Sequence, residues 1–303
     1  MKTTYLLLCL LGIGSVSGAG QTKQPQKIGD FIESTSYNEH RRNATRSLQY
    51  TPDGDDFVCI NGKNRFTRAL YGSHTAFRLE TSDRPVFAAY TKENPKHICF
   101  KLQTSGGTVA LDSTEHCESR YTAGRRSYSL SDPAFGGGSL SITTWALPDK
   151  EGAIWQFNAR NFKEFHPVLL ASISEIRNSK LNRNGDMGAD PADSFEAPLQ
   201  PQQLQSFPVQ IDGTLYILLE NQELRTLTTA EGENLFKKAE AARSETASRI
   251  RIETPDPYFN TLGGTLAMAA DGIWDGEVWL HGAIGWRLSL IHISEPTRRS
   301  YIS

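Results

Sequence analysis

Short apolar runs separated by turn residues fill the chain from Ser47 to Thr228, and this pattern predicts a mainly β structure. Between Ser139 and Leu147, apolar residues alternate with serine and threonine, which is the period of a strand with one buried face. Similar runs predict strands at Phe57–Ile60, Phe66–Leu70, Thr75–Leu79, Val86–Tyr90, Ile98–Leu102, Thr108–Leu111, Arg126–Leu130, Ala153–Ala159, Val168–Ile173, Val209–Ile211 and Leu215–Leu219. Many short strands at regular spacing favour a large antiparallel β-sandwich of two sheets over residues 47–228.

Three turn signals suggest how neighbouring strands connect. Pro52-Asp53-Gly54 predicts a turn, and the dipeptides Asn61-Gly62 and Asp212-Gly213 predict tight hairpins because their residues tolerate a positive φ. We therefore expect the strands on either side of each dipeptide to pair with one another. The charged residues of these strands, Arg65, Arg68, Arg125 and Arg126, are expected at the surface.

The pattern changes to a helical period at Thr228. Thr228 and Glu231 have the spacing of a capping box, and a Lys- and Glu-rich helix is predicted over Glu231–Ser248. We interpret residues 229–253 as a linker helix between domains. After the rigid turn at Pro255-Asp256-Pro257, a second helix is predicted over Phe259–Ala270, with glycines at 263 and 264 that allow close packing.

Both ends of the chain are interpreted as segments outside the fold. Residues 1–19 have the positive start, apolar run and small residues of a signal peptide, although a buried first helix is the alternative. The polar residues 20–46 read as a linker. Residues 288–303 are expected to be a non-native tail, because Leu288–Arg298 can be back-translated into an adapter used in transposase-based sequencing libraries. We expect an exported protein, periplasmic or secreted, without a membrane anchor after signal cleavage, from a gene that continues past Arg287.

Composition narrows the classes further. A length of 303 residues allows about two domains, and a net charge of -2 gives no indication of a nucleic-acid partner. Cys59, Cys99 and Cys117 remain after the signal peptide; they match no zinc spacing and are expected to be mostly buried thiols, with at most one disulfide. The Asn-, Asp- and Gly-rich segment 182–193 could offer oxygen ligands to calcium, but it lacks EF-hand spacing and is better explained as a solvated loop. No metal or other cofactor is expected.

The candidate chemistry is concentrated between Thr254 and Arg287, which holds three of the five tryptophans. Aromatic rings that stack on apolar ligand faces, with carboxylates and a guanidinium between them, are typical of carbohydrate sites. The alternative is that these side chains are buried for packing alone. The predicted substrate-binding residues are Trp274, Asp275, His281, Trp286 and Arg287.

Two segments carry a resemblance to a known family. NGKNRFTRALYGSHTAFRLE (Asn61–Glu80) and IETPDPYFNTLGGTLAMAADGIWDGEVWLHGAIGWR (Ile252–Arg287) resemble the domain-of-unknown-function 4450 family, exported proteins of polysaccharide-degrading Bacteroides-type bacteria. The order of sandwich, linker helix and Trp-rich segment is also similar to the six-hairpin toroid glycosidases. The resemblance implies an N-terminal supersandwich and an (α/α)6 barrel of which residues 254–287 are the truncated start.

Two functions are consistent with these features. In the first, the parent protein is a glycoside hydrolase that uses two carboxylates on poly- or oligosaccharides, and this chain by itself is inactive because the resemblance puts the general acid on a later hairpin. Polysaccharide lyase and glycoside phosphorylase chemistry remain variants of this hypothesis. In the second, the sandwich is a non-catalytic carbohydrate-binding or structural module.

Overall fold

The computed structural model describes residues 50–63, 66–72, 77–90, 96–162, 167–175, 203–208, 213–274, 280–281 and 286–287. All of these belong to one unit of the chain, which begins at Leu48. The predicted signal peptide, the polar linker, the 182–193 loop and the tail from Leu288 lie outside the described residues. Within the described ranges, no helix has both the length and the hydropathy needed to cross a bilayer.

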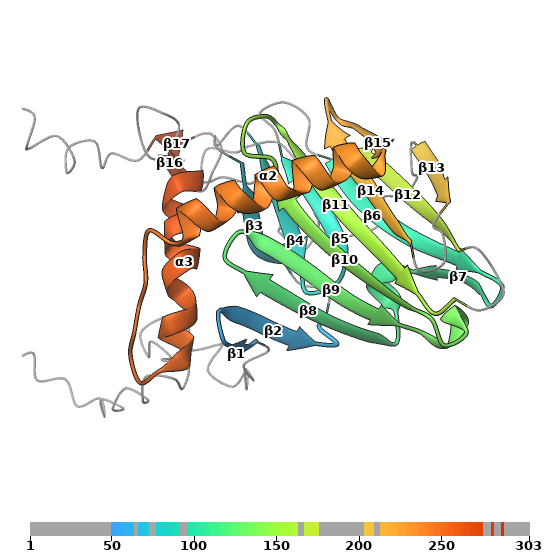
Figure 1. Cartoon of the computed structure of the whole chain (residues 1–303), viewed down its shortest axis with the longest axis horizontal. Helices are drawn as coiled ribbons and strands as arrows, with labels where there is room; N and C mark the ends of the chain where they lie inside the picture. Colours follow the sequence, from blue (N-terminus) through green and yellow to red (C-terminus); the bar gives the residue numbers. More distant parts are fainter. Residues whose placement is uncertain are drawn as a thin grey trace, which may run out of the picture. The chain divides into compact units, whose positions relative to one another are not determined.

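An eight-stranded antiparallel sheet forms one layer (Figure 1). Its strand order is β1-β2-β8-β9-β10-β11-β14-β15. The strands are β1 (Thr51–Asp53), β2 (Asp56–Ile60), β8 (His116–Thr122), β9 (Arg125–Ser131), β10 (Ser139–Ala146), β11 (Gly152–Arg160), β14 (Thr214–Glu220) and β15 (Glu223–Leu227).

A seven-stranded antiparallel sheet forms the other layer, with the order β13-β12-β6-β5-β4-β3 and with β7 also paired to β6. Its strands are β3 (Phe66–Tyr71), β4 (Arg78–Ser82), β5 (Val86–Tyr90), β6 (Lys96–Thr104), β7 (Gly107–Ala110), β12 (Val168–Glu175) and β13 (Gln203–Pro208). Two short 3-10 helices, η2 (Leu111–Ser113) and η3 (Pro133–Phe135), lie in the connections.

The two sheets share one hydrophobic core. The ring of Phe87 in β5 lies 5.4 Å from that of Trp155 in β11, and the rings of Phe100 in β6 and Phe157 in β11 are 5.0 Å apart. All four side chains are almost completely buried, so the inner faces of the two sheets meet through edge-to-face aromatic contacts. The prediction of a mainly β structure built from antiparallel sheets is confirmed.

Most predicted strands are present, but β1, β8, β13 and β15 were missed. In β8 the buried positions are Cys117, Ser119 and Tyr121. A small hydroxyl residue at the central buried position hides the apolar alternation that identifies other strands. The turn expected at Pro52-Asp53-Gly54 is displaced, because Pro52 and Asp53 belong to β1 and the turn residues are Gly54 and Asp55.

The hairpin predicted at Asn61-Gly62 is wrong in its pairing. Asn61 has the expected positive φ of 48°, but the strands on either side of Asn61-Gly62 belong to different sheets. The Asn61 amide oxygen accepts a hydrogen bond from the Cys117 backbone N–H at 2.8 Å, so this residue fixes a crossover between sheets. The hairpin predicted at Asp212-Gly213 stays a prediction, because residues 209–212 lie outside the described residues.

Arg126 corrects another expectation, because it is fully buried between the sheets and not a surface charge. Its guanidinium donates to Thr81 Oγ1 at 3.2 Å and to Ser119 Oγ at 3.0 Å. The rings of Tyr50, Tyr121 and Tyr128 lie within 6.0 Å of its guanidinium carbon. Hydroxyl acceptors and aromatic faces therefore replace water around this charge.

Cys59, Cys99 and Cys117 are free thiols, as expected. Burial is the main cause that raises the pKa of all three, and it raises the pKa of Cys117 to about 12. Because only the thiolate is a good nucleophile, the raised pKa values make these thiols poor nucleophiles.

The helix α2 (Thr229–Ala247) covers the outer face of the eight-stranded sheet (Figure 1). Thr228 accepts a hydrogen bond from the Glu231 N–H, and the Glu231 carboxylate accepts one from the Thr228 N–H, which confirms the predicted capping box. Phe236 packs against Trp145 of β10 and Tyr216 of β14, and the Trp145 indole donates to Glu240 at 2.8 Å. The linker helix therefore lies flat on the sheet.

The second predicted helix is also present. α3 (Pro257–Gly272) begins after the N-cap Asp256, which accepts a hydrogen bond from the Tyr258 N–H at 2.9 Å. A Cβ added at Gly263 would lie 2.9 Å from the Ile250 carbonyl oxygen, and one added at Gly264 would lie 2.9 Å from the Ala123 Cβ. Both glycines therefore allow the close packing that the sequence suggested.

Candidate functional site

The predicted substrate-binding residues lie at and beyond the C-terminal end of α3. Trp274 follows this helix, is partly buried, and donates its backbone N–H to the Asp271 carbonyl at 3.2 Å. His281 and Trp286 face each other in the two-stranded ladder of β16 (Leu280–His281) and β17 (Trp286–Arg287), where Arg287 faces Leu280. Asp275 and the side chains of His281, Trp286 and Arg287 lie outside the described part.

The end of α3 packs directly on the seven-stranded sheet. Gly272 lies so close to Tyr71 of β3 that an added Cβ would overlap the tyrosine ring. Tyr71 belongs to the segment Asn61–Glu80, and Gly272 belongs to the segment Ile252–Arg287. The two stretches that carry the family resemblance therefore touch at this point, although two hundred residues of chain separate them.

Two rows of side chains cross the outer face of the seven-stranded sheet beside this contact. Residues directly opposite in an antiparallel ladder share a face. The first row contains Tyr71, Arg78 and Tyr90, in β3, β4 and β5. The second row crosses five strands and contains Ala69, Glu80, Ala88, His97 and Ser174. We call this second set the polar row.

Arg78 and Glu80 form the charged centre of this face. The Arg78 Nε atom lies 2.6 Å from Glu80 Oε1, and the guanidinium carbon lies 4.7 Å from the centre of the Tyr90 ring. Glu80 is only 3% exposed. Burial disfavours its charged form and raises the pKa of this carboxyl to about 7, although the Arg78 charge acts in the opposite direction.

The polar row retains unused hydrogen-bonding capacity. Glu80 Oε2 and Ser174 Oγ are buried and have no hydrogen-bond partner within the structure that is described. His97 is equally buried, at 2% exposure. Ala88 lies between Glu80 and His97 in this row, and Ala69 lies at its end, next to Glu80. Buried polar atoms of this kind are uncommon in native folds and mark candidate functional positions.

The polar row was not predicted from the sequence. Arg78 falls inside a predicted strand, and Glu80 lies just beyond its expected end. A sequence pattern that could have indicated this row is the strand RLETS, in which the charged residues Arg78 and Glu80 occupy alternate positions. His97 and Cys99 alternate in the same way in β6. Alternation alone indicates an outward face exposed to water, and only the tertiary structure shows that this face is buried.

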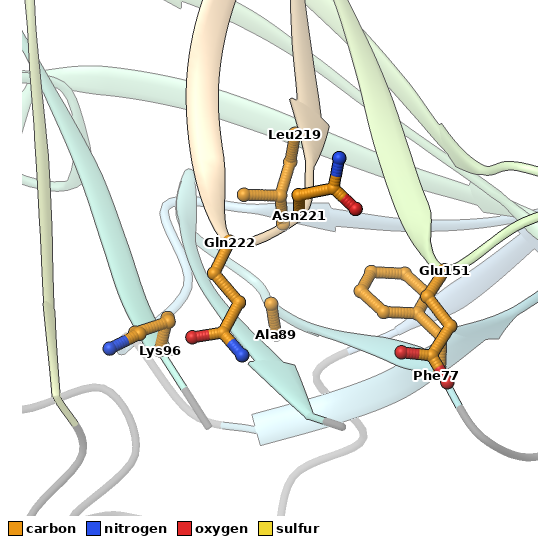
Figure 2. A pocket seen from close by; sticks show the side chains of 7 residues that line it. All are labelled: Phe77, Ala89, Lys96, Glu151, Leu219, Asn221 and Gln222. Carbon is orange, nitrogen blue, oxygen red and sulfur yellow. The ribbon is translucent and has the colours of Figure 1, made fainter. Parts of the chain in front are cut away.

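A cavity of about 310 Å³ lies at one open end of the space between the sheets (Figure 2). It is lined by Phe77, Ala89, Lys96, Glu151, Leu219, Asn221 and Gln222. None of these residues was predicted as a ligand contact. In contrast, the described residues contain no group of three or more His, Cys, Asp or Glu side chains placed to hold a metal ion.

Together, the fold and these sites define a mainly β protein of two antiparallel sheets with two helices and a buried polar face. Residues 95–250 match the family model described as domain of unknown function (DUF4450). The chain therefore belongs to this family, which confirms the predicted resemblance. No match was found among curated proteins.

Proposed function

We propose that this chain is the N-terminal part of an exported enzyme that acts on poly- or oligosaccharides with glycoside hydrolase chemistry. The observation that carries the proposal is the contact between Gly272 and Tyr71. It places the residues that follow α3, including Trp274, next to a sheet face that holds Arg78 and the ionisable Glu80. Aromatic rings next to carboxyl and guanidinium groups suit the recognition of a sugar ring and its hydroxyls.

In this proposal the two-sheet domain is a supersandwich and α3 is the first helix of an (α/α)6 barrel. An apolar stripe on α3 supports this interpretation. Phe259 and Leu266 are seven positions apart, on one face of the helix, and are 41% and 49% exposed. A helix that packs inside a barrel of helices would present such a stripe to its neighbour.

Trp274, Asp275, His281, Trp286 and Arg287 line one sugar subsite in the proposed enzyme. Trp274 supplies a stacking wall, and Asp275 holds ligand hydroxyls in place. Glycoside hydrolysis needs two carboxyl groups on either side of the bond, one to protonate the leaving oxygen and one to activate water or attack carbon. The proposed general acid lies on a helical hairpin encoded beyond Arg287, so the present chain binds sugars weakly and does not turn them over.

The proposed location is the periplasm or the cell exterior. Residues 1–19 act as the export signal in this proposal and are removed. A poly- or oligosaccharide is the proposed partner.

The experiment compares this chain with the protein encoded by the uninterrupted gene, assayed on a panel of plant and host glycans. Turnover is expected only in the longer protein. There, Asp275→Asn and Trp274→Ala should each lower kcat/KM by at least about tenfold. Asp55→Asn, in the exposed turn after β1, is the matched control and should leave kcat/KM unchanged. Equal turnover by the present chain would contradict the proposed division of catalytic residues.

A non-catalytic module is the second candidate. It is favoured by the exposed Phe259 and Leu266 on α3, because an apolar helix face can dock on another domain without any catalytic group. Glycan binding without turnover in the longer protein would support this module and reject the enzyme.

A further inference from the structure

The cavity at the end of the two sheets has an apolar floor. Phe77, Ala89 and Leu219 are each 3% exposed and come from the inner faces of both layers. Figure 2 shows Ala89 and Phe77 below the turn that joins β14 to β15, and Leu219 in the strand that leads into this turn. One of the three is an aromatic ring, so the floor can contact the apolar face of a small cyclic ligand.

The rim of the cavity is polar. It consists of Lys96, Glu151, Asn221 and Gln222. One cation and one anion balance each other, which disfavours a strongly charged ligand. The two amides can both donate and accept hydrogen bonds. Within the described residues, the side chains of Glu151, Asn221 and Gln222 make no hydrogen bond or ion pair, so they are available to a ligand.

The turn that carries the two amides is conformationally unusual. Asn221 and Gln222 form a two-residue hairpin loop in which both have a positive φ, of 52° and 64°. Asn-Gly is the common choice for such a loop, because a glycine adopts this conformation without strain. A glutamine in the second position retains an amide side chain against that preference, and strained residues of this kind cluster at binding sites. Lys150 anchors the base of the turn through an ion pair of 2.7 Å with Glu220.

We propose that this cavity is a binding site for a single neutral sugar ring, distinct from the Trp274 segment. An aromatic and aliphatic floor with a neutral, amide-bearing rim matches a molecule that has apolar C–H faces and many hydroxyls. A volume of about 310 Å³ lies at the lower limit for small-molecule pockets, so it accommodates one ring and not a polymer in full. The ring can be a free monosaccharide or the end of an oligosaccharide.

The test is calorimetric titration of the whole chain with neutral hexoses and pentoses, with their oligosaccharides, and with glucosamine and galacturonic acid as charged probes. A neutral sugar is expected to bind in the millimolar range. Gln222→Gly is the principal variant, because it removes the amide and also relieves the backbone strain, so the protein remains folded. It should weaken binding by about tenfold, which corresponds to the loss of one to two hydrogen bonds. Glu151→Gln retains hydrogen-bonding groups and should have a smaller effect.

Glu223→Gln, next to the turn but outside the cavity lining, is the matched control and should bind like the original chain. Saturation by oligosaccharides only would assign the site to chain ends, and saturation by monosaccharides as well would assign it to free sugars. The proposal is overturned if no neutral sugar binds up to roughly 50 mM. It is also overturned if Gln222→Gly binds as tightly as the original, or if the charged probes bind better. Since Trp274 is not part of this cavity, Trp274→Ala should leave this binding intact even if the proposed enzyme function fails.

Discussion

At the scale of single residues, the most consequential group is Glu80. Its carboxyl lies in the seven-stranded sheet with Arg78 as an ionic partner and is 3% exposed. Moving a carboxylate out of water is costly, and one ion pair compensates for this cost only in part. The pKa of Glu80 is therefore raised to about 7, because burial raises it more than the Arg78 charge lowers it. Near neutral pH this carboxyl is therefore partly protonated, whereas an ordinary surface glutamate is almost fully ionised.

The first prediction concerns pH and stability. Between the ordinary pKa of 4.5 and the folded-state pKa of about 7, the unfolded chain has lost the Glu80 proton while the folded chain keeps it. The contribution of this group is therefore greatest below the ordinary pKa, falls as the pH rises, and is fully lost above 7. The fall amounts to roughly 3 kcal/mol at most. Urea unfolding of the original chain and of Glu80→Gln at pH 5 and pH 8 measures it.

The original chain should lose more stability between these two pH values than Glu80→Gln loses. Glu245→Gln, an exposed position on α2, serves as the control and should follow the original chain. A pH dependence that is the same in all three proteins would show that Glu80 titrates at its ordinary pKa.

At the scale of elements, the contact between α3 and β3 fixes the position of the end of α3, from which Trp274 and the following residues continue. Gly272 ends the helix against the Tyr71 ring, and α3 also donates the Thr261 hydroxyl to the Gly54 carbonyl at 3.3 Å, next to β1. The helix is thus held at both ends by strands of different sheets. Any larger residue at 272 must displace either the helix end or the tyrosine.

The second prediction is that Gly272→Ala destabilises the chain by about 1–3 kcal/mol, because the added methyl overlaps Tyr71. Alanine is the better helix former, so propensity alone predicts the opposite sign. Thermal or urea unfolding of Gly272→Ala, Tyr71→Ala and the double variant measures the coupling. In the Tyr71→Ala background the same methyl should no longer be destabilising. An equal penalty in both backgrounds would show that the overlap is not its cause.

At the scale of the whole molecule, the two sheets have different outer faces. The eight-stranded sheet is covered by α2 through an apolar contact that includes Trp145 and Phe236. The seven-stranded sheet instead carries the Arg78–Glu80 pair and the polar row. Beside them, α3 presents Phe259 and Leu266 to solvent. Exposed large apolar groups on one helix face favour association with another surface.

The third prediction follows from this exposed stripe. Leu266→Lys should reduce self-association of the present chain, measured by light scattering, because it places a charge on the apolar face. In the longer protein proposed above, the same substitution should lower the free energy of unfolding by about 2–5 kcal/mol, the cost of burying an unpaired charge or losing a core leucine. Ile60→Lys is the matched control, since Ile60 is 52% exposed but lies on β2. It should leave the stability of the longer protein unchanged, and equal effects of both substitutions would contradict the proposed barrel.

The sequence by itself determined the local structure of this protein. The period-two run at 139–147 became β10, and the capping box of Thr228 and Glu231 became the start of α2, because both depend on contacts within a few residues. The family resemblance was also recognised from two segments of the sequence, Asn61–Glu80 and Ile252–Arg287. The turn at Asn221-Gln222 was missed, since glutamine is rarely selected for a positive φ.

Only the tertiary structure decided which strands are neighbours and which polar side chains are buried. Asn61 adopts the backbone conformation that its sequence predicts, yet it leads into the other sheet, because pairing depends on contacts across the whole core and not on the turn alone. Arg126, Glu80 and His97 look like ordinary surface groups of alternating strands, but each is at most 3% exposed. Their environment is made by residues far away in the chain, so no local pattern encodes it.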